Sequence, residues 1–141
     1  MNLTTKQAKN LGLKSLNQAA PKKAQALLPV REYDSKVEET YAWRLDLEKT
    51  AGRIRNYMHH PFRLRLARGV TYQPDFLVVR VDGVIELHEV KGGYIREKGR
   101  VKYMTAAEAF PMFQFVLVVG TGSGRRGFTW KTERYHKEVE E

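Results

Sequence analysis

The sequence contains no cysteine, which excludes a disulfide framework and a metal site built from thiolates. It also lacks a long hydrophobic run, because the longest, about Phe115–Val119, is far too short to cross a bilayer. Residues 1–30 lack the apolar stretch of a signal peptide. Together these absences predict a cytoplasmic protein that does not enter a membrane.

Acidic residues are in the minority, since 16 Asp and Glu face 25 Lys and Arg, for a formal charge of +9 at pH 7. A domain this basic is typical of proteins that bind a polyanion, nucleic acid before membrane. Charge alone leaves open a soluble basic protein with no such partner. The 141 residues fit one domain, and a hydrophobic content of 42% is enough for a folded core.

Residues 1–33 are predicted to form a basic N-terminal extension. Their six Lys and Arg residues face a single acid, Glu32. Two short helical stretches, near Thr5–Leu11 and Lys22–Leu28, are separated by Pro21 and ended by Pro29. Such a segment suits a mobile arm, a DNA-contacting arm or a dimerisation element, and the sequence does not choose among them.

The rest of the chain alternates helical and β-type patterns. A helix is predicted from about Ser35 to Thr50, with Asp34 or Ser35 as its cap and Gly52 just past its end. The other predicted elements are strands at Ile54–Met58, Phe62–Ala67, Tyr72–Val81 and Val84–Lys91, a helix at Arg100–Phe110, a strand at Phe113–Val119, a glycine-rich loop at Gly120–Gly127 and a strand at Phe128–Arg134. This order predicts an α/β fold with a central mixed β-sheet flanked by helices.

Asp82-Gly83 joins two of these strands in a predicted hairpin, and the length of its loop decides which side chains meet. A two-residue turn would put Asp75 and Glu89 on different faces of the hairpin. A three-residue loop, with Gly83 in the left-handed conformation, pairs Arg80 with Val84 and brings Asp75 opposite Glu89. This second register also aligns the apolar side chains on one face, so it is the one we predict.

Two carboxylates about 5 Å apart repel each other unless a cation lies between them. Oxygen ligands suit Mg²⁺ or Mn²⁺, and Lys91, on the same face as Glu89, could contact a phosphate or a water. The alternative is an ordinary carboxylate–lysine pair at a strand end. Pro74-Asp75, the hairpin and the shared apolar face favour the metal site.

At these residues the sequence resembles the PD-(D/E)XK nuclease superfamily. Pro74-Asp75 matches the PD, and Glu89-Val90-Lys91 matches the acid–x–Lys element. The resemblance is strongest to small phage-type endonucleases and to the N-terminal nuclease domain of TnsA-type transposition endonucleases, whose pattern includes a strand like His60-Pro61-Phe62-Arg63-Leu64-Arg65-Leu66. It covers about Ser35–Val119, so residues 34–141 are expected to form a nuclease-like domain with a restriction-endonuclease-like core.

The resemblance implies a Mg²⁺- or Mn²⁺-dependent endonuclease that hydrolyses DNA. Asp75, Glu89 and the Val90 carbonyl would hold the metal, and Lys91 would position the water and stabilise the developing charge. The family adds a glutamate from the preceding helix, here Glu38, with Glu39 as the fallback. Both Glu38 as a ligand and Glu38 as an exposed capping residue remain open. A role in cutting branched DNA, a homodimer that makes paired incisions, and a phage or mobile-element origin in a host-cell cytoplasm follow by analogy.

Basic residues near the expected site are candidates for DNA contact. They are Arg96, Lys98, Arg100 and Lys102 after the Glu89-Val90-Lys91 strand, and Arg125 and Arg126 in the glycine-rich loop. His59 and His60 form a tempting metal pair, but neighbours in a strand point to opposite faces, so we expect them not to chelate one ion.

Two other functions remain possible on the sequence alone. One is a non-catalytic nucleic-acid-binding subunit of a recombination or transposition complex, which the acid–acid–lysine set argues against. The other is a ribonuclease, because no feature of the sequence reads a 2′-hydroxyl.

Overall fold

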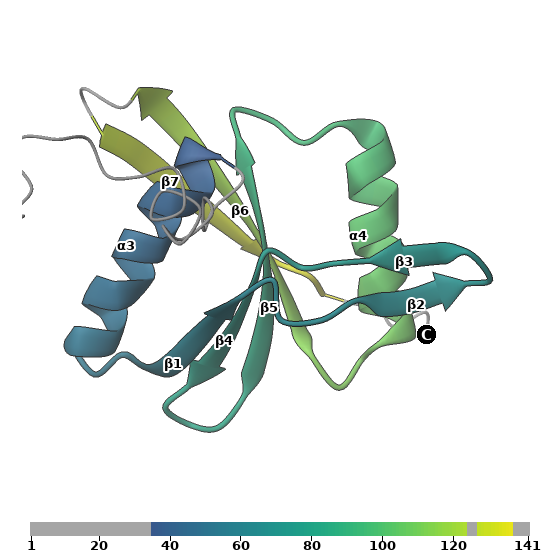
Figure 1. The fold of residues 1–141 in the computed structure, drawn as a ribbon, viewed down its shortest axis with the longest axis horizontal. Coiled ribbons are helices and arrows are strands. Elements are labelled where there is room, and N and C mark those ends of the chain that lie inside the picture. The colour runs from purple at the N-terminus through teal and green to yellow at the C-terminus, as the bar shows by residue number, and fades with distance from the viewer. Residues whose placement is uncertain (1–34, 124–126, 137–141) are drawn as a thin grey trace, which may run out of the picture. The chain divides into compact units, whose positions relative to one another are not determined.

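The computed structural model describes residues 35–123 and 127–136 (Figure 1). The predicted extension 1–33, the cap candidate Asp34, and the predicted DNA contacts Arg125 and Arg126 lie outside these residues. No helix within the described ranges has the length and apolar character needed to cross a membrane.

The fold is α/β, with a central mixed sheet of five strands in the order β1-β4-β5-β6-β7. These strands are β1 (Ile54–His59), β4 (Phe76–Arg80), β5 (Ile85–Gly92), β6 (Gln114–Ser123) and β7 (Gly127–Arg134). All neighbouring pairs are antiparallel except β5 and β6, which are parallel. A parallel pair needs a crossover connection, and helix α4 (Glu97–Ala109) provides it.

Helices cover both faces of the sheet (Figure 1). Helix α3 (Lys36–Thr50) packs Tyr41, Ala42 and Leu45 against one face, in a core with Phe76 and Val90. Helix α4 packs on the opposite face with a small hairpin, β2 (Leu64–Ala67) and β3 (Val70–Tyr72). Its core contains the buried side chains Leu64, Tyr72, Leu87, Tyr103, Phe115 and Leu117. Each fully buried large side chain, such as Phe76 or Leu87, contributes about 1.5–3 kcal/mol to folding.

The start of α3 follows the predicted capping pattern. Ser35 is the N-cap, and its side-chain oxygen accepts a hydrogen bond from the Glu38 backbone N–H at 3.2 Å. Gly52 follows the helix with a φ of 74°, a conformation that glycine adopts without steric cost. Helix α4, by contrast, begins at Glu97, three residues before the predicted Arg100.

The hairpin register is the predicted one. Val79 pairs with Ile85 and Leu77 with Leu87, and the Arg80 N–H donates to the Val84 carbonyl at 2.9 Å. Gly83 has a φ of 86°, as the three-residue loop requires.

The structure departs further from the predicted boundaries at two other places. Tyr72–Val81 is not one strand, because the chain breaks around Pro74 into β3 and β4, which belong to different sheets. Proline has no N–H to extend the ladder, which explains the break. The predicted loop Gly120–Gly127 is also shorter than expected, since β6 continues to Ser123 and β7 begins at Gly127.

Candidate metal and nucleic-acid site

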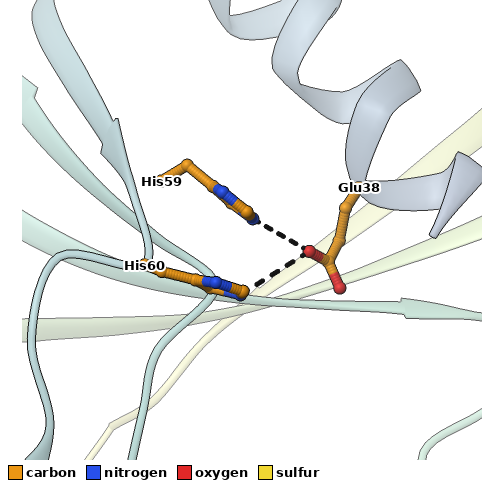
Figure 2. Close-up of side chains that lie close together, drawn as sticks. All are labelled: Glu38, His59 and His60. Atoms are coloured by element: carbon orange, nitrogen blue, oxygen red, sulfur yellow. Dashed lines mark hydrogen bonds and ion pairs between the residues drawn. The ribbon is translucent and has the colours of Figure 1, made fainter. Parts of the chain in front are cut away.

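The first turn of α3 carries Glu38, which lies on the inner side of the helix and is only 9% exposed. Its carboxylate oxygen Oε2 lies 3.0 Å from His59 Nε2 and 3.8 Å from His60 Nε2 (Figure 2). Glu38 is therefore not an exposed capping glutamate. Glu39, the fallback candidate, is exposed to solvent.

The prediction that His59 and His60 point to opposite faces was wrong. Their rings stack with centroids 3.8 Å apart, and both approach Glu38. His60 follows the last residue of β1 and has a φ of 44°, in the left-handed region that few residues other than glycine adopt. This local change of direction ends the strand alternation and turns the His60 ring to the side of His59. The sequence alone gives no sign of it.

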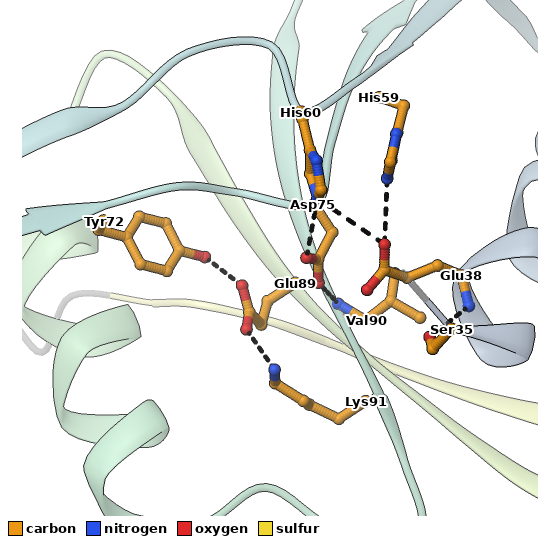
Figure 3. Close-up of polar contacts among 9 residues, drawn as sticks. All are labelled: Ser35, Glu38, His59, His60, Tyr72, Asp75, Glu89, Val90 and Lys91. Atoms are coloured by element: carbon orange, nitrogen blue, oxygen red, sulfur yellow. Dashed lines mark hydrogen bonds and ion pairs between the residues drawn. The ribbon is translucent and has the colours of Figure 1, made fainter. Parts of the chain in front are cut away.

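Asp75 lies immediately before β4, where β4 and β5 separate (Figure 3). Its Oδ2 accepts a hydrogen bond of 2.7 Å from the Val90 backbone N–H. If the pairing of β4 with β5 continued, Val90 would lie opposite Pro74. The Asp75 side chain instead accepts the hydrogen bond from the Val90 N–H that a paired strand would accept. Because the N–H and C=O of one strand residue point to the same edge, the Val90 carbonyl faces the side where Asp75 lies.

Glu89 is buried on the side of Asp75 away from Glu38 (Figure 3). The Tyr72 hydroxyl donates to its Oε2 at 2.8 Å, and Lys91 Nζ lies 3.1 Å from its Oε1. Lys91 is the more exposed partner, with 40% of its side chain accessible. Sequence reasoning missed Tyr72, which stands three residues before Asp75 and reaches the site from the separate sheet of β2 and β3.

The electrostatics of the site reflect a surplus of buried negative charge. Burial first, and then the neighbouring Glu89 and Glu38 carboxylates, raise the pKa of Asp75 to about 8, against the lowering effect of the Val90 N–H and Lys91. Burial lowers the pKa of Lys91, but the pull of Glu89 outweighs it and the net shift is upward. Burial and Glu89 together raise the pKa of the Tyr72 hydroxyl, so Tyr72 stays a hydrogen-bond donor.

The predicted basic residues do not all line the same hollow. Arg96, Lys98 and Lys102 line a hollow of about 420 Å³ together with Lys91 and Tyr94. Arg100 instead lines hollows on the side of Leu117 and Glu133. The structure thus brings three of the four predicted residues beside Lys91.

His88, which precedes Glu89 in β5, points to the opposite side of the sheet. Its Nδ1 lies 2.7 Å from the Tyr41 hydroxyl under helix α3, and its ring is buried. It therefore belongs to the core on the α3 side and not to the carboxylate site.

The described residues that could hold a cation are Glu38, Asp75, Glu89, His59 and His60. Glu38, His59 and His60 offer ligand atoms that all lie within 4.8 Å of one another. Oxygen donors, two imidazoles and one partly exposed lysine beside a basic hollow can neutralise and orient a phosphate-like anion through a bound cation. Comparison of the chain with family models, curated proteins and solved structures gave no match.

Proposed function

We propose that this chain is a divalent-metal-dependent endonuclease that hydrolyses DNA phosphodiester bonds on a restriction-endonuclease-like core. The observation that carries the proposal is the meeting of Asp75, Glu89 and Lys91 where β4 and β5 separate. Each comes from the PD and acid–x–Lys elements of the sequence, and the hairpin register aligns them.

The donor set fits Mg²⁺ or Mn²⁺. Asp75, Glu89 and Glu38 are buried carboxylates, and the Val90 carbonyl faces the same edge. Within the described residues near this point, Lys91 is the one lysine in contact with them, so a cation would relieve their repulsion. When bound, such an ion supplies Lewis acidity and lowers the pKa of a bound water.

The side chains of the protein have separate roles in this proposal. Asp75 and Glu89 hold the cation, and Tyr72 and the Val90 N–H fix the orientation of their carboxylates. Lys91 is exposed enough to leave Glu89 and donate to a phosphate oxygen or an attacking water. Arg96, Lys98 and Lys102 bind the phosphate backbone in the hollow that Lys91 shares.

The test is cleavage of DNA by the purified full chain with Mg²⁺, with Mn²⁺ and with a chelator. We expect metal-dependent nicking, and a hundredfold or greater loss of rate in Asp75→Asn and in Lys91→Ala, about the loss seen when a group that stabilises transition-state charge is removed. Matched controls are Asp82→Asn, at the turn end of the same hairpin, and Lys49→Ala, at the end of α3. Both should cleave like the unmodified protein.

Linear, single-stranded, flap and four-way-junction DNA, with an RNA duplex beside them, would define the substrate. Preference for the branched substrates would support a structure-selective enzyme, and cleavage of RNA alone would make it a ribonuclease. If all variants cut at the same rate, the activity belongs to a contaminant. Metal-independent DNA binding without cleavage would instead support a binding subunit.

A further inference from the structure

We propose that Glu38, His59 and His60 form a binding site for a transition-metal ion of the Mn²⁺, Co²⁺ and Zn²⁺ class, adjacent to the carboxylate site of Asp75 and Glu89. The inference goes beyond the proposed nuclease activity, because binding a metal here requires no phosphodiester hydrolysis. The two proposals share Glu38, which lies between the imidazoles and Asp75 (Figure 3).

The positions of the donor atoms carry the inference (Figure 2). Glu38 Oε2 lies 3.0 Å from His59 Nε2 and 3.8 Å from His60 Nε2, and the three ligand atoms all lie within 4.8 Å of one another. Nitrogen and oxygen ligands about 2.0–2.2 Å from one ion lie roughly 3–3.5 Å apart. Small side-chain rotations would therefore bring these three atoms onto a single ion.

The backbone explains how two adjacent histidines reach one carboxylate. His59 is the last residue of β1. The left-handed φ of 44° at His60 places the His60 ring on the same side of the chain as the His59 ring. The His60 N–H donates to the Asp75 carbonyl at 2.8 Å, so this conformation is held by the segment that carries the other carboxylate. The histidine rings are thus fixed beside Glu38, and little conformational freedom would be lost on binding an ion.

The ligand types decide which ion the site would take. Neutral imidazole nitrogen binds Mn²⁺, Co²⁺ and Zn²⁺ well, whereas Mg²⁺ prefers oxygen ligands and keeps much of its hydration shell. Asp75 Oδ1, 4.0 Å from His60 Nε2, is near enough to join the same ion or to bridge to a neighbouring one. An ion at the histidines would therefore resist competition from Mg²⁺.

The test is a Co²⁺ titration of the full-length, chelator-treated protein without DNA, followed by the visible absorption of Co²⁺ and repeated in excess Mg²⁺. We expect Co²⁺ binding that Mg²⁺ does not displace. His59→Gln and His60→Gln keep a polar amide for Glu38 but bind transition metals poorly. Each should weaken binding at least tenfold, since loss of groups that only orient a ligand already costs 10- to 100-fold.

His136→Gln is the matched control, because it removes an exposed histidine from the end of the described chain and should leave Co²⁺ binding unchanged. Thermal unfolding of each apo-protein would show that the variants fold. Equal Co²⁺ affinity in the folded His59 and His60 variants would overturn the proposal and leave Glu38 with ordinary ion pairs. So would displacement of Co²⁺ by Mg²⁺.

Lys91→Ala separates this site from the nuclease proposal. It should keep full Co²⁺ binding and lose DNA cleavage. A Lys91→Ala protein that cleaves like the unmodified chain would contradict the nuclease while leaving the metal site in place. Metal-dependent cleavage in Mg²⁺ without any Co²⁺ binding that depends on His59 and His60 would contradict the metal site and leave the nuclease proposal in place.

Discussion

Strand β5 buries two glutamates three residues apart, Glu86 and Glu89, in opposite electrostatic settings. Glu86 accepts a hydrogen bond from Arg134 and lies 3.8 Å from His88 Nε2. Burial raises the pKa of Glu86, but His88 and Arg134 outweigh it and the pKa falls below its ordinary value. Glu89 adjoins a second carboxylate, Asp75, whose pKa is raised to about 8 by burial and by Glu89 itself.

The difference distinguishes a structural carboxylate from one suited to bind a cation. The two glutamates are similarly buried on one strand but have different neighbours, because an arginine from β7 reaches Glu86 whereas Lys91 and a second carboxylate, Asp75, lie beside Glu89. A buried charge with a complete set of partners stabilises a fold. Neighbouring buried carboxylates repel each other, and such pairs are candidates for functional sites.

The largest expected effect is stabilisation by metal. An ion that binds only the folded chain adds about 2.7 kcal/mol to the free energy of unfolding at 100 times its Kd. We expect thermal unfolding in Mg²⁺, which prefers the oxygen ligands of the carboxylate site, to show this gain in the unmodified chain. Asp75→Asn should lose it and should be no less stable than the unmodified apo-protein, because burial beside Glu89 already disfavours the charged form of Asp75.

Glu86→Gln is the matched control for that measurement, since it changes the other kind of buried carboxylate. It should keep the gain in Mg²⁺ but unfold at a lower temperature in the absence of metal. If Asp75→Asn and Glu86→Gln respond alike to Mg²⁺, the contrast between Glu86 and Glu89 has no functional meaning.

A smaller effect should come from Arg134→Ala, which leaves Glu86 buried without its guanidinium partner. We expect a loss of about 2 kcal/mol at pH 7, below the cost for a fully buried pair because 46% of the Arg134 side chain is exposed. The Glu86 pKa is lowered in the folded protein, so its stabilising effect is present above 4.5 and is lost as the pH falls through the folded pKa.

The two proteins should therefore converge in stability at acid pH, as denaturant unfolding from pH 7 to pH 3 would measure. Arg53→Ala is the control, because Arg53 pairs with Glu48 at the surface and its loss should cost less than 1 kcal/mol. A constant difference between Arg134→Ala and the unmodified chain at every pH would mean that the arginine acts by packing alone.

The smallest effect concerns the turn that sets the register of the hairpin. Gly83→Ala places a side chain at a φ of 86° and should cost about 1 kcal/mol in denaturant unfolding. Gly99→Ala, inside α4, should instead be neutral or stabilising by about 0.5 kcal/mol. No loss at Gly83 would show that the apolar pairs, and not the turn, align Asp75 with Glu89.

The sequence was sufficient to predict those features of the fold that depend on local patterns. The hairpin register followed from Gly83 and from the alignment of Leu77 with Leu87, since a slip by one residue would expose the apolar face. The cap at Ser35 was one of two predicted candidates, and the helix ends at the predicted Thr50. These features depend on residues close to one another in the sequence, so the local pattern of residue types is enough to predict them.

Other features depend on contacts between distant segments and could not be predicted. Arg134 meets Glu86 across 48 residues, and Tyr72 reaches Glu89 from a different sheet. The left-handed conformation of His60 overrides strand alternation, and no residue pattern announces it. The least predictable part of the site is thus its set of supporting partners.

The hydrogen bond from the Val90 N–H to Asp75 has a further consequence for ion size. It engages Oδ2, so Asp75 would offer a cation chiefly its Oδ1, as a monodentate ligand. Ca²⁺ commonly takes both oxygens of a carboxylate in a shell of six to eight ligands, whereas Mg²⁺ takes single oxygens in an octahedron. At the proposed site the backbone amide would therefore favour the ion of smaller radius where the two compete.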